Sequence, residues 1–290
     1  MKKSKWILFT LVLFIVGIYF IAVNKEKSIS IDQTGQVQAV VDETSSGKAQ
    51  VDWRYVSAMA EVKYGIEEIS DEEIRQLTNQ FITEENDDFK IKEIDRVLTE
   101  NEYSQEEKEE VKNYYNQLTD QIEAADNNNL KKMQRNFIND IEAIAIENYE
   151  TYRILPSITI AQAILESDWG RSTLSSEYNN YFGIKSHNWD GESVNLETKE
   201  YYDETIEDAF RVYDQMEDSV KDHGEFLATH DRYKKNGLFN GTTYMEQAVA
   251  LQDAGYSTIE NEQGEKIYSD QLAQIIQQHQ LQLIDSKVYQ

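Results

Sequence analysis

The chain has 290 residues, of which 40% are hydrophobic and 11% aromatic, and its formal net charge is -26 at pH 7. Such a chain is long and apolar enough to fold into more than one domain. The charge argues against nucleic-acid binding, which needs Lys and Arg against phosphates, and against electrostatic attraction to anionic lipids or wall polymers. Because the chain has no cysteine, disulfides, thiol nucleophiles and cysteine-based metal sites are excluded.

The amino-terminal segment predicts a membrane anchor. Residues 6–23, WILFTLVLFIVGIYFIAV, contain no charged side chain, and as a helix they would extend about 27 Å, close to the thickness of a bilayer's hydrocarbon layer. Lys2, Lys3 and Lys5 precede this run, so the amino end should stay in the cytoplasm and the rest of the chain should lie outside, as in a type II membrane protein. A cleaved signal peptide is the alternative, although no clean pair of small residues precedes Asn24.

Two further segments separate this anchor from the rest of the chain. Residues 24–50 are polar and are expected to form a tether with little fixed structure. Residues 51–129 are expected to be a helical juxtamembrane region, because Ser70-Asp-Glu-Glu73 and Ser104-Gln-Glu-Glu107 are capping boxes before apolar residues at helical spacing. The apolar residues of 89–98 suggest another short helix between them. A membrane-protein partner for this region stays open, and the sequence does not identify it.

Polar residues 126–129, Asp-Asn-Asn-Asn, predict a boundary, after which residues 130–286 form a second domain. Residues 130–149 have the apolar spacing of an amphipathic helix. Pro156 is tolerated in the first turn of a helix, so it predicts the start of a second helix that continues to Ser167.

Glu166 is the first candidate for chemistry in this second helix. Thr159, Gln162 and Glu166 share one face at spacings of three and four, which is suitable for lining a cleft. Glu166 would lie in the last turn, where the helix dipole disfavours a negative charge, and close to the apolar ring of Trp169; both effects raise a carboxyl pKa. A carboxyl that keeps its proton near neutral pH is the general acid that glycosidic cleavage requires, as in lysozyme. The alternative is an ordinary helix-end glutamate in water.

Residues 155–185, LPSITIAQAILESDWGRSTLSSEYNNYFGIK, closely resemble the signature of the glucosaminidases of glycoside hydrolase family 73, bacterial β-N-acetylglucosaminidases that cut peptidoglycan. Later parts of the resemblance are the segments Thr198–Tyr201, Phe210–Tyr213, Asp222-His223 and Ala254–Ser257. The resemblance implies a mainly helical α+β fold, with a lysozyme-like catalytic domain and a small β-lobe. The layout, with one transmembrane helix and a helical region before the catalytic domain, is also similar to membrane-anchored glucosaminidases of Gram-positive bacteria.

The resemblance also assigns catalytic residues. The glutamate of the family's Leu-Glu-Ser motif is the catalytic acid, and it matches Glu166. The family's second carboxylate lies in the β-lobe, and Glu200 is the best match, within a region whose alternation predicts a hairpin. Its competitors are Glu192, Glu197 and Asp203. Glu200 would act as a general base for water, unless the sugar's own acetamido group takes part instead.

One position departs from the family pattern. The residue after the Glu-Ser pair is commonly glycine, and here it is Asp168. If this position requires a positive φ, aspartate tolerates it better than most residues do. We therefore interpret Asp168 as tolerated variation.

Sugar rings present flat C–H faces, so a glycan groove favours aromatic side chains. The predicted substrate-binding residues are Gln162, Trp169, Asn180, Tyr181, Tyr201 and Tyr256. Tyr256 matches a tyrosine that the family places near the scissile bond. For Trp169 the alternative role is packing in the core, and for Asn180 it is the shaping of a turn. The four histidines have no metal-ligand spacing, and neither a metal nor another cofactor is expected.

The resemblance implies hydrolysis of the β-1,4 bond between N-acetylglucosamine and N-acetylmuramic acid in peptidoglycan, outside the cell membrane. A muramidase or lytic transglycosylase acting on the neighbouring bond is the rival within enzymes. A catalytically inactive glycan-binding adaptor is the rival of another class. The presence of both Glu166 and Glu200 favours an enzyme.

Overall fold

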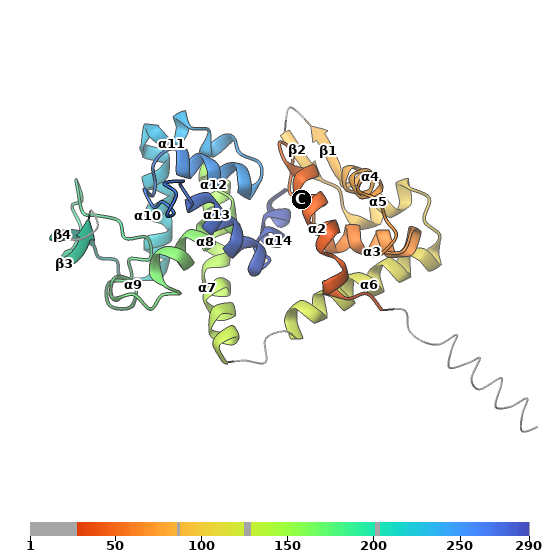
Figure 1. The fold of residues 1–290 in the computed structure, drawn as a ribbon, viewed down its shortest axis with the longest axis horizontal. Helices are drawn as coiled ribbons and strands as arrows, with labels where there is room; N and C mark the ends of the chain where they lie inside the picture. Colours follow the sequence, from red (N-terminus) through yellow and green to blue (C-terminus); the bar gives the residue numbers. More distant parts are fainter. Residues whose placement is uncertain (1–27, 86–87, 125–128, 201–203, 290) are drawn as a thin grey trace, which may run out of the picture.

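The structure is a computed structural model that describes residues 28–85, 88–124, 129–200 and 204–289. Figure 1 shows two groups of helices side by side, an N-terminal lobe before residue 125 and a C-terminal domain after residue 128. Each has its own hydrophobic core. The predicted anchor at residues 6–23 lies outside the described residues. No helix within the described ranges is both long and apolar enough to cross a bilayer.

The N-terminal lobe is mainly helical, with one hairpin. Its elements are η1 (Ile31–Gln33), α2 (Gly35–Ser45), α3 (Trp53–Lys63), α4 (Asp71–Phe81), β1 (Ile82–Glu85), β2 (Asp88–Ile91), α5 (Ile94–Glu100) and α6 (Gln105–Ala124). Both predicted capping boxes are confirmed. Glu73 closes the box at the start of α4, and at α6 the Ser104 amide donates to Glu107 Oε2 at 2.7 Å.

Two expectations for this lobe are wrong. Much of the predicted tether, residues 24–50, is ordered, because Val37, Val40 and Val41 lie at helical spacing and α2 buries all three in the core of the lobe. The predicted helix at residues 89–98 begins only at Ile94. The residues before it form strand β2, which pairs antiparallel with β1 directly after α4.

The C-terminal domain is also mainly helical, as expected. Its elements are α7 (Asn129–Tyr152), α8 (Pro156–Ser167), α9 (Thr173–Tyr178), β3 (Ser193–Glu200), β4 (Glu204–Arg211), α10 (Met216–Thr229), α11 (Asp231–Lys235), η3 (Leu238–Asn240), α12 (Tyr244–Asp253), α13 (Tyr268–Gln278), α14 (Gln282–Asp285) and η4 (Ser286–Tyr289). Strands β3 and β4 form the predicted antiparallel hairpin. In Figure 1 the hairpin lies at the far side of the domain from the N-terminal lobe.

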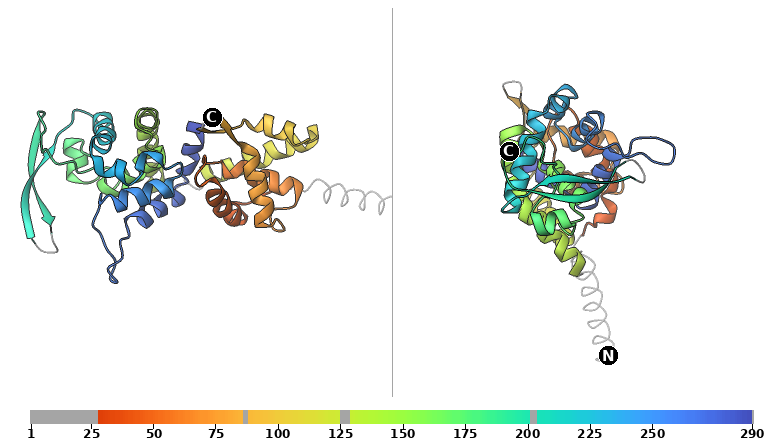
Figure 2. Two further views of the ribbon diagram at one scale, coloured as in Figure 1. Left: turned by 90° about the horizontal axis from the view of Figure 1, so that it is seen from above. Right: turned by 90° about the vertical axis from the view of Figure 1, so that its left-hand side faces the viewer.

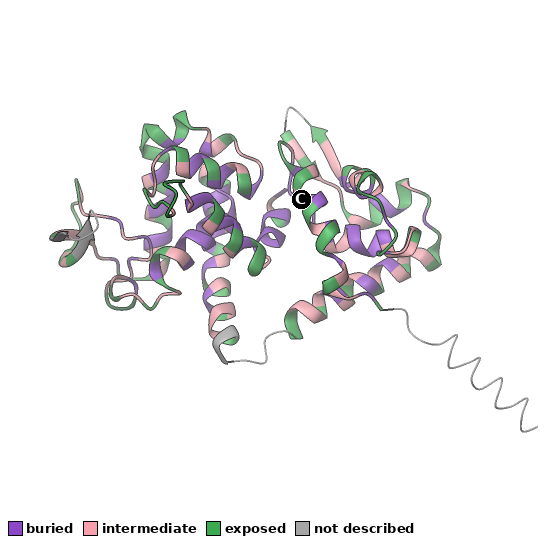
Figure 3. Cartoon of the chain, viewed as in Figure 1, coloured by how far each residue is buried: buried purple, intermediate pink, exposed green. Residues whose placement is uncertain are grey.

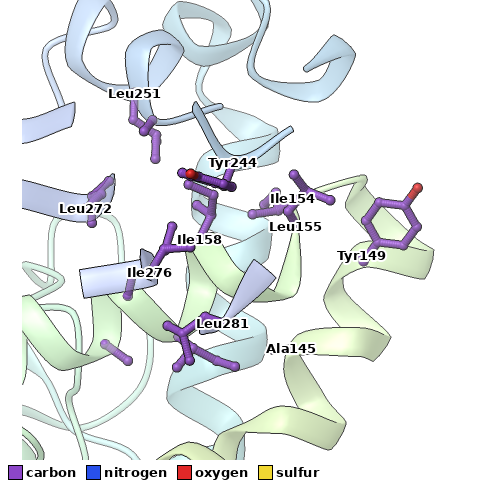
Figure 4. Packing of buried hydrophobic residues seen from close by; sticks show 14 of the residues in the cluster. Ala145, Tyr149, Ile154, Leu155, Ile158, Tyr244, Leu251, Leu272, Ile276 and Leu281 are labelled. Atoms are coloured by element: carbon purple, nitrogen blue, oxygen red, sulfur yellow. The ribbon is translucent and has the colours of Figure 1, made fainter. Parts of the chain in front are cut away.

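Helix α8 is the centre of this domain. It begins at Pro156 as predicted, is buried along nearly its whole length, and packs against α7, α12, α13 and α14. Figure 4 shows Ile158 of α8 among Tyr244, Leu272 and Ile276 of the surrounding helices. Figure 3 shows the same burial as a run of purple through the interior of the domain.

The amino end of α8 is fixed by a buried carboxyl group. Asp285 of α14 accepts hydrogen bonds from the Ser157 amide at 2.9 Å and from the Ser157 hydroxyl at 2.5 Å. Burial raises the pKa of Asp285 to about 7, although both hydrogen bonds oppose the shift. The residue before the helix is held as well, since the Leu155 amide donates to Gln247 Oε1 at 2.9 Å.

The two lobes meet through polar contacts around α12 and the end of α13. Tyr244 donates its hydroxyl to Asp42 of α2 at 2.7 Å, and Trp53 of α3 donates its indole N–H to Gln280 at 2.8 Å. Burial raises the pKa of the Asp42 carboxyl. The N-terminal lobe therefore packs against the same helices that surround α8.

Candidate active site

A cavity of about 640 Å³ opens beside the carboxyl end of α8. Glu166 lines this cavity and is exposed to solvent. The other described lining residues are Phe182, Gly183, Ile184, Lys185, His187, Asn188, Arg211, Phe226, Thr229, His230, Arg232, Tyr233, Tyr256 and Ser257. The cavity thus joins the end of α8 to the hairpin side of the domain and to α10, α11 and the end of α12.

The Glu166 carboxyl is subject to two opposing effects. Desolvation raises its pKa, and a hydrogen bond from the Tyr268 hydroxyl to Oε1, at 2.9 Å, lowers it, with a net shift upward. The direction agrees with the sequence analysis, but the aromatic neighbours differ. Tyr256 lines the cavity and stacks on Tyr268 with 5.4 Å between ring centroids, whereas Trp169 points elsewhere.

Gln162 fixes the orientation of the tyrosine. It is fully buried on α8, one turn before Glu166, and its amide donates to the Tyr268 hydroxyl at 3.0 Å. Because that hydroxyl oxygen accepts from Gln162, its own proton is directed at Glu166. Gln162 therefore lies behind the tyrosine and does not line the cavity, so the structure gives it a supporting place in the site.

The turn after Glu166 has a left-handed backbone. Asp168, Trp169 and Gly170 have φ values of 50°, 60° and 73°. Asp168 caps α8 in this conformation, and its carboxylate pairs with Arg171 at 2.6 Å, out in solvent. A Cβ at Gly170 would lie 3.0 Å from the Phe137 ring, so this position favours glycine. The departure at Asp168 is accommodated without contact to the cavity.

Three other predicted sugar-binding residues lie outside the cavity lining. Trp169 packs edge-on against Phe137 and His279, with ring centroids 5.8 Å and 4.8 Å away. Tyr181 also packs against Phe137. Asn180 is buried, and its side chain bonds the Ile184 amide and carbonyl, each at 3.0 Å. Their contacts are those of packing and turn formation, and of the predicted set Tyr256 lines the cavity.

The second predicted carboxylate, Glu200, is placed by its backbone. It is the last residue of β3 and lies opposite Glu204 in the hairpin. It is an even number of positions from Val194 and Leu196, so it belongs to the same face of the strand. Its side chain, Asp203 and the predicted sugar-binding residue Tyr201 lie outside what the structure describes. Glu192 and Glu197 are exposed.

The hairpin that carries Glu200 projects from the domain. Both views of Figure 2 show it extending on the same side of the domain as the loop formed by residues 257–267, which carries the bridge between Glu260 and Lys266. The cavity is lined from both directions, by Arg211 at the base of the hairpin and by Ser257 at the base of the loop. The base of each projection therefore contributes to the cavity lining.

Sequence reasoning missed several residues of the site. Tyr268 belongs to no motif, and only its place at the start of an apolar helix stripe is visible in the sequence. The cationic and imidazole side chains that line the cavity were also missed: Lys185, His187, Arg211, His230 and Arg232. No local spacing indicates them, because three separate segments bring them together.

A partly desolvated carboxyl group with a raised pKa, in an open cavity beside tyrosine rings on a mainly helical scaffold, is the arrangement of an acid-catalysed glycoside hydrolase. A family profile described as Glucosaminidase, mannosyl-glycoprotein endo-beta-N-acetylglucosaminidase, matches residues 142–281. Residues 142–281 therefore form a glucosaminidase-family domain of the glycoside hydrolases. The match contains α8, the hairpin and Tyr268.

Similar proteins carry related names. Exo-glucosaminidase LytG of Bacillus subtilis is 37% identical over 158 residues, which are 52% of this chain and 54% of that protein. A probable N-acetylmuramidase of Lactococcus lactis is 36% identical over 51% of this chain and 34% of its own length. The catalytic domain of the autolysin Auto from Listeria monocytogenes is 32% identical, with a TM-score of 0.46 over 53% of this chain and 88% of that structure. The chain spans about half or less of the length of the two curated relatives.

The contact between Tyr268 and Glu166 predicts a measurable shift. Tyr268→Phe removes the hydrogen bond that favours the carboxylate, so the Glu166 pKa should rise further above its usual value. Carbon-13 NMR titration of the glutamate carboxyls measures it, with the Glu166 signal assigned by its loss in Glu166→Gln. Tyr152→Phe removes a hydroxyl elsewhere and should leave the signal in place. An unchanged or lower Glu166 pKa in Tyr268→Phe would contradict the assigned role.

Proposed function

We propose that the protein is a peptidoglycan hydrolase that cleaves the β-1,4 bond between N-acetylglucosamine and N-acetylmuramic acid. The observation that carries the proposal is the Glu166 carboxyl, held in an open cavity with a raised pKa and a hydrogen bond from Tyr268. The names of relatives support it, since they include an exo-glucosaminidase and the peptidoglycan hydrolase FlgJ of Vibrio parahaemolyticus, which is 30% identical over 149 residues.

Glu166 acts as the general acid in this proposal. Tyr268 occupies Oε1, so Oε2 is the oxygen that carries the proton and gives it to the leaving glycosidic oxygen. After the transfer Glu166 is a carboxylate, and the Tyr268 hydrogen bond stabilises that charged form. By itself this contact favours ionisation, but burial outweighs it and keeps the Glu166 pKa raised in the free site.

Glu200 is the proposed second carboxylate. The proposal is supported by its backbone position near the free end of the hairpin, whose base contributes Arg211 to the cavity lining. As a general base it would activate water on the opposite face of the sugar, which inverts the anomeric configuration. In the alternative route the substrate's acetamido group attacks first, and the configuration is retained.

The loss of the general acid gives the first test of this function. Glu166→Gln keeps the side-chain volume but removes the proton donor, so digestion of purified sacculi should fall by roughly 10²- to 10⁴-fold. Glu177→Gln, at an exposed position on α9, is the matched control and should digest normally. Turbidity loss measures the rate, and circular dichroism verifies folding. Digestion by Glu166→Gln at the wild-type rate would refute the proposal.

Mass spectrometry of the wild-type digest separates the rival activities. New reducing ends of N-acetylglucosamine support the proposed bond, and reducing ends of N-acetylmuramic acid identify a muramidase, an activity favoured by the names of the Lactococcus lactis relatives. Anhydro-muramic ends identify a lytic transglycosylase. Glycan binding without any new ends identifies a non-catalytic adaptor.

The second carboxylate has its own test. If Glu200 is the general base, Glu200→Gln should lower kcat by at least about 100-fold, while Glu197→Gln on the same strand should stay close to wild type. Proton NMR of the fresh product distinguishes the routes, since direct attack by water inverts the anomer and acetamido participation retains it. A large loss in Glu197→Gln together with an active Glu200→Gln would transfer the role to Glu197.

We also propose that residues 6–23 anchor the protein as a single-pass type II membrane protein with its catalytic domain outside. The support is the length of the uncharged run and the basic residues before it. In a Gram-positive host, the full chain should stay in membranes after an alkaline carbonate wash and be digested by external protease, whereas a chain without residues 1–27 should not associate with membranes. A shortened, released protein would instead identify a cleaved signal peptide.

A further inference from the structure

The cavity around Glu166 differs in charge from the chain as a whole. The net charge of the chain is -26, which repels anionic ligands at long range. Among the described lining residues, however, Glu166 is the sole carboxylate, and the cationic side chains are Lys185, Arg211 and Arg232. The site thus collects positive charge on a negative surface.

Two of these three cations already have carboxylate partners. Lys185 pairs with Asp208 at 2.6 Å, and Arg211 Nη1 lies 2.7 Å from both carboxylate oxygens of Asp222. Tyr213 also donates its hydroxyl to Asp222. The first pair joins the loop before the hairpin to β4, and the second joins β4 to α10, so both charges are largely compensated.

Arg232 is held differently, because its contacts in the described part of the chain are to neutral groups. Nη1 donates to the Gly255 carbonyl at 3.2 Å, and Nη2 donates to the Tyr233 hydroxyl at 2.6 Å. The guanidinium also lies 4.7 Å from the centroid of the Tyr233 ring, which is itself buried. These contacts orient the guanidinium and leave the Nε hydrogen and one hydrogen on each Nη for a ligand.

We propose that Arg232 binds a carboxylate of the substrate, so that the site selects glycans with carboxylate-bearing substituents over neutral ones. This inference rests on the proposed function, because the lactyl group of N-acetylmuramic acid, or the peptide attached to it, supplies such a carboxylate beside the scissile bond. A guanidinium fork matches a carboxylate in geometry, and an oriented one loses little freedom on binding.

The positive charge of Arg232 also offsets, within the cavity, the repulsion that the net negative charge of the chain exerts on an anionic substrate. Peptidoglycan carries carboxylates, and the surface of the protein repels them. A cation without a carboxylate partner, in the cavity that contains the general acid, attracts the substituent at short range where the repulsion matters most. A glycan of N-acetylglucosamine alone has no carboxylate, so it would form no ion pair with Arg232.

The test compares two forms of one soluble glycan. The first is a peptide-free strand of alternating N-acetylglucosamine and N-acetylmuramic acid with free lactyl carboxylates, and the second is the same strand with those carboxylates converted to methylamides. Both present the same bond to Glu166. The wild-type enzyme should prefer the first, and Arg232→Gln should lower the ratio of the two kcat/KM values by about tenfold. Arg232→Lys should lower the ratio less, since it keeps the charge and loses the fork.

Lys234→Gln is the matched control, because it removes one positive charge from the same short helix at an exposed position outside the cavity lining. It should leave the ratio at the wild-type value. Equilibrium binding of both strands to Glu166→Gln, with and without Arg232→Gln, repeats the comparison without turnover. An unchanged ratio in Arg232→Gln, or an equal fall in Lys234→Gln, overturns the inference while leaving the proposed function intact. If the wild-type enzyme cuts neither strand nor sacculi, the proposed function fails instead.

Discussion

The position of helix α8 is the constraint on which the site depends. Its amino end is held by Asp285 through Ser157, and its carboxyl end presents Glu166 to Tyr268. Between these ends the helix is almost entirely buried among four other helices, so it cannot shift along its axis without opening the core. The Glu166 carboxyl is therefore placed by packing, and the hydrogen bond from Tyr268 orients its side chain.

The electrostatics of the site follow from where α8 stops. One turn further inside, Glu166 would be enclosed and would stay protonated throughout the reaction; one turn further out, water would return its pKa to the usual range. At the observed position, burial raises the pKa while Tyr268 supplies a donor for the charged form. Each pKa unit corresponds to about 1.4 kcal/mol, so modest changes in either contact alter the proton balance of a catalytic cycle.

The sequence predicts what is local in this structure and misses what is distant. The start of α8 at Pro156 and the hairpin follow from neighbouring residues, whereas the Glu166 pKa is raised as expected but by burial and not by the Trp169 ring. Tyr268 is 102 positions from Glu166, and no periodicity links them. Trp169 is adjacent in sequence, but the left-handed turn directs it to Phe137 and away from the cavity. Residues 24–50 are predicted to be a tether because most of them are polar. The apolar stripe that makes part of this segment helix α2 consists of only a few residues and is not recognised.

The N-terminal lobe packs against the C-terminal domain away from the cavity. None of its described residues lines the cavity, and Figure 1 places it opposite the hairpin. It covers the helices that clamp α8, where Asp42 meets Tyr244, and the Asp42 charge helps to raise the pKa of Asp285. For a carboxyl whose pKa is raised on folding, from 3.8 to about 7 at Asp285, the stabilisation is complete at acidic pH and is lost as pH rises through the folded value. The Asp285 contribution is therefore being lost as pH approaches 7, while the Tyr244 and Trp53 hydrogen bonds connect the N-terminal lobe to the helices behind Glu166.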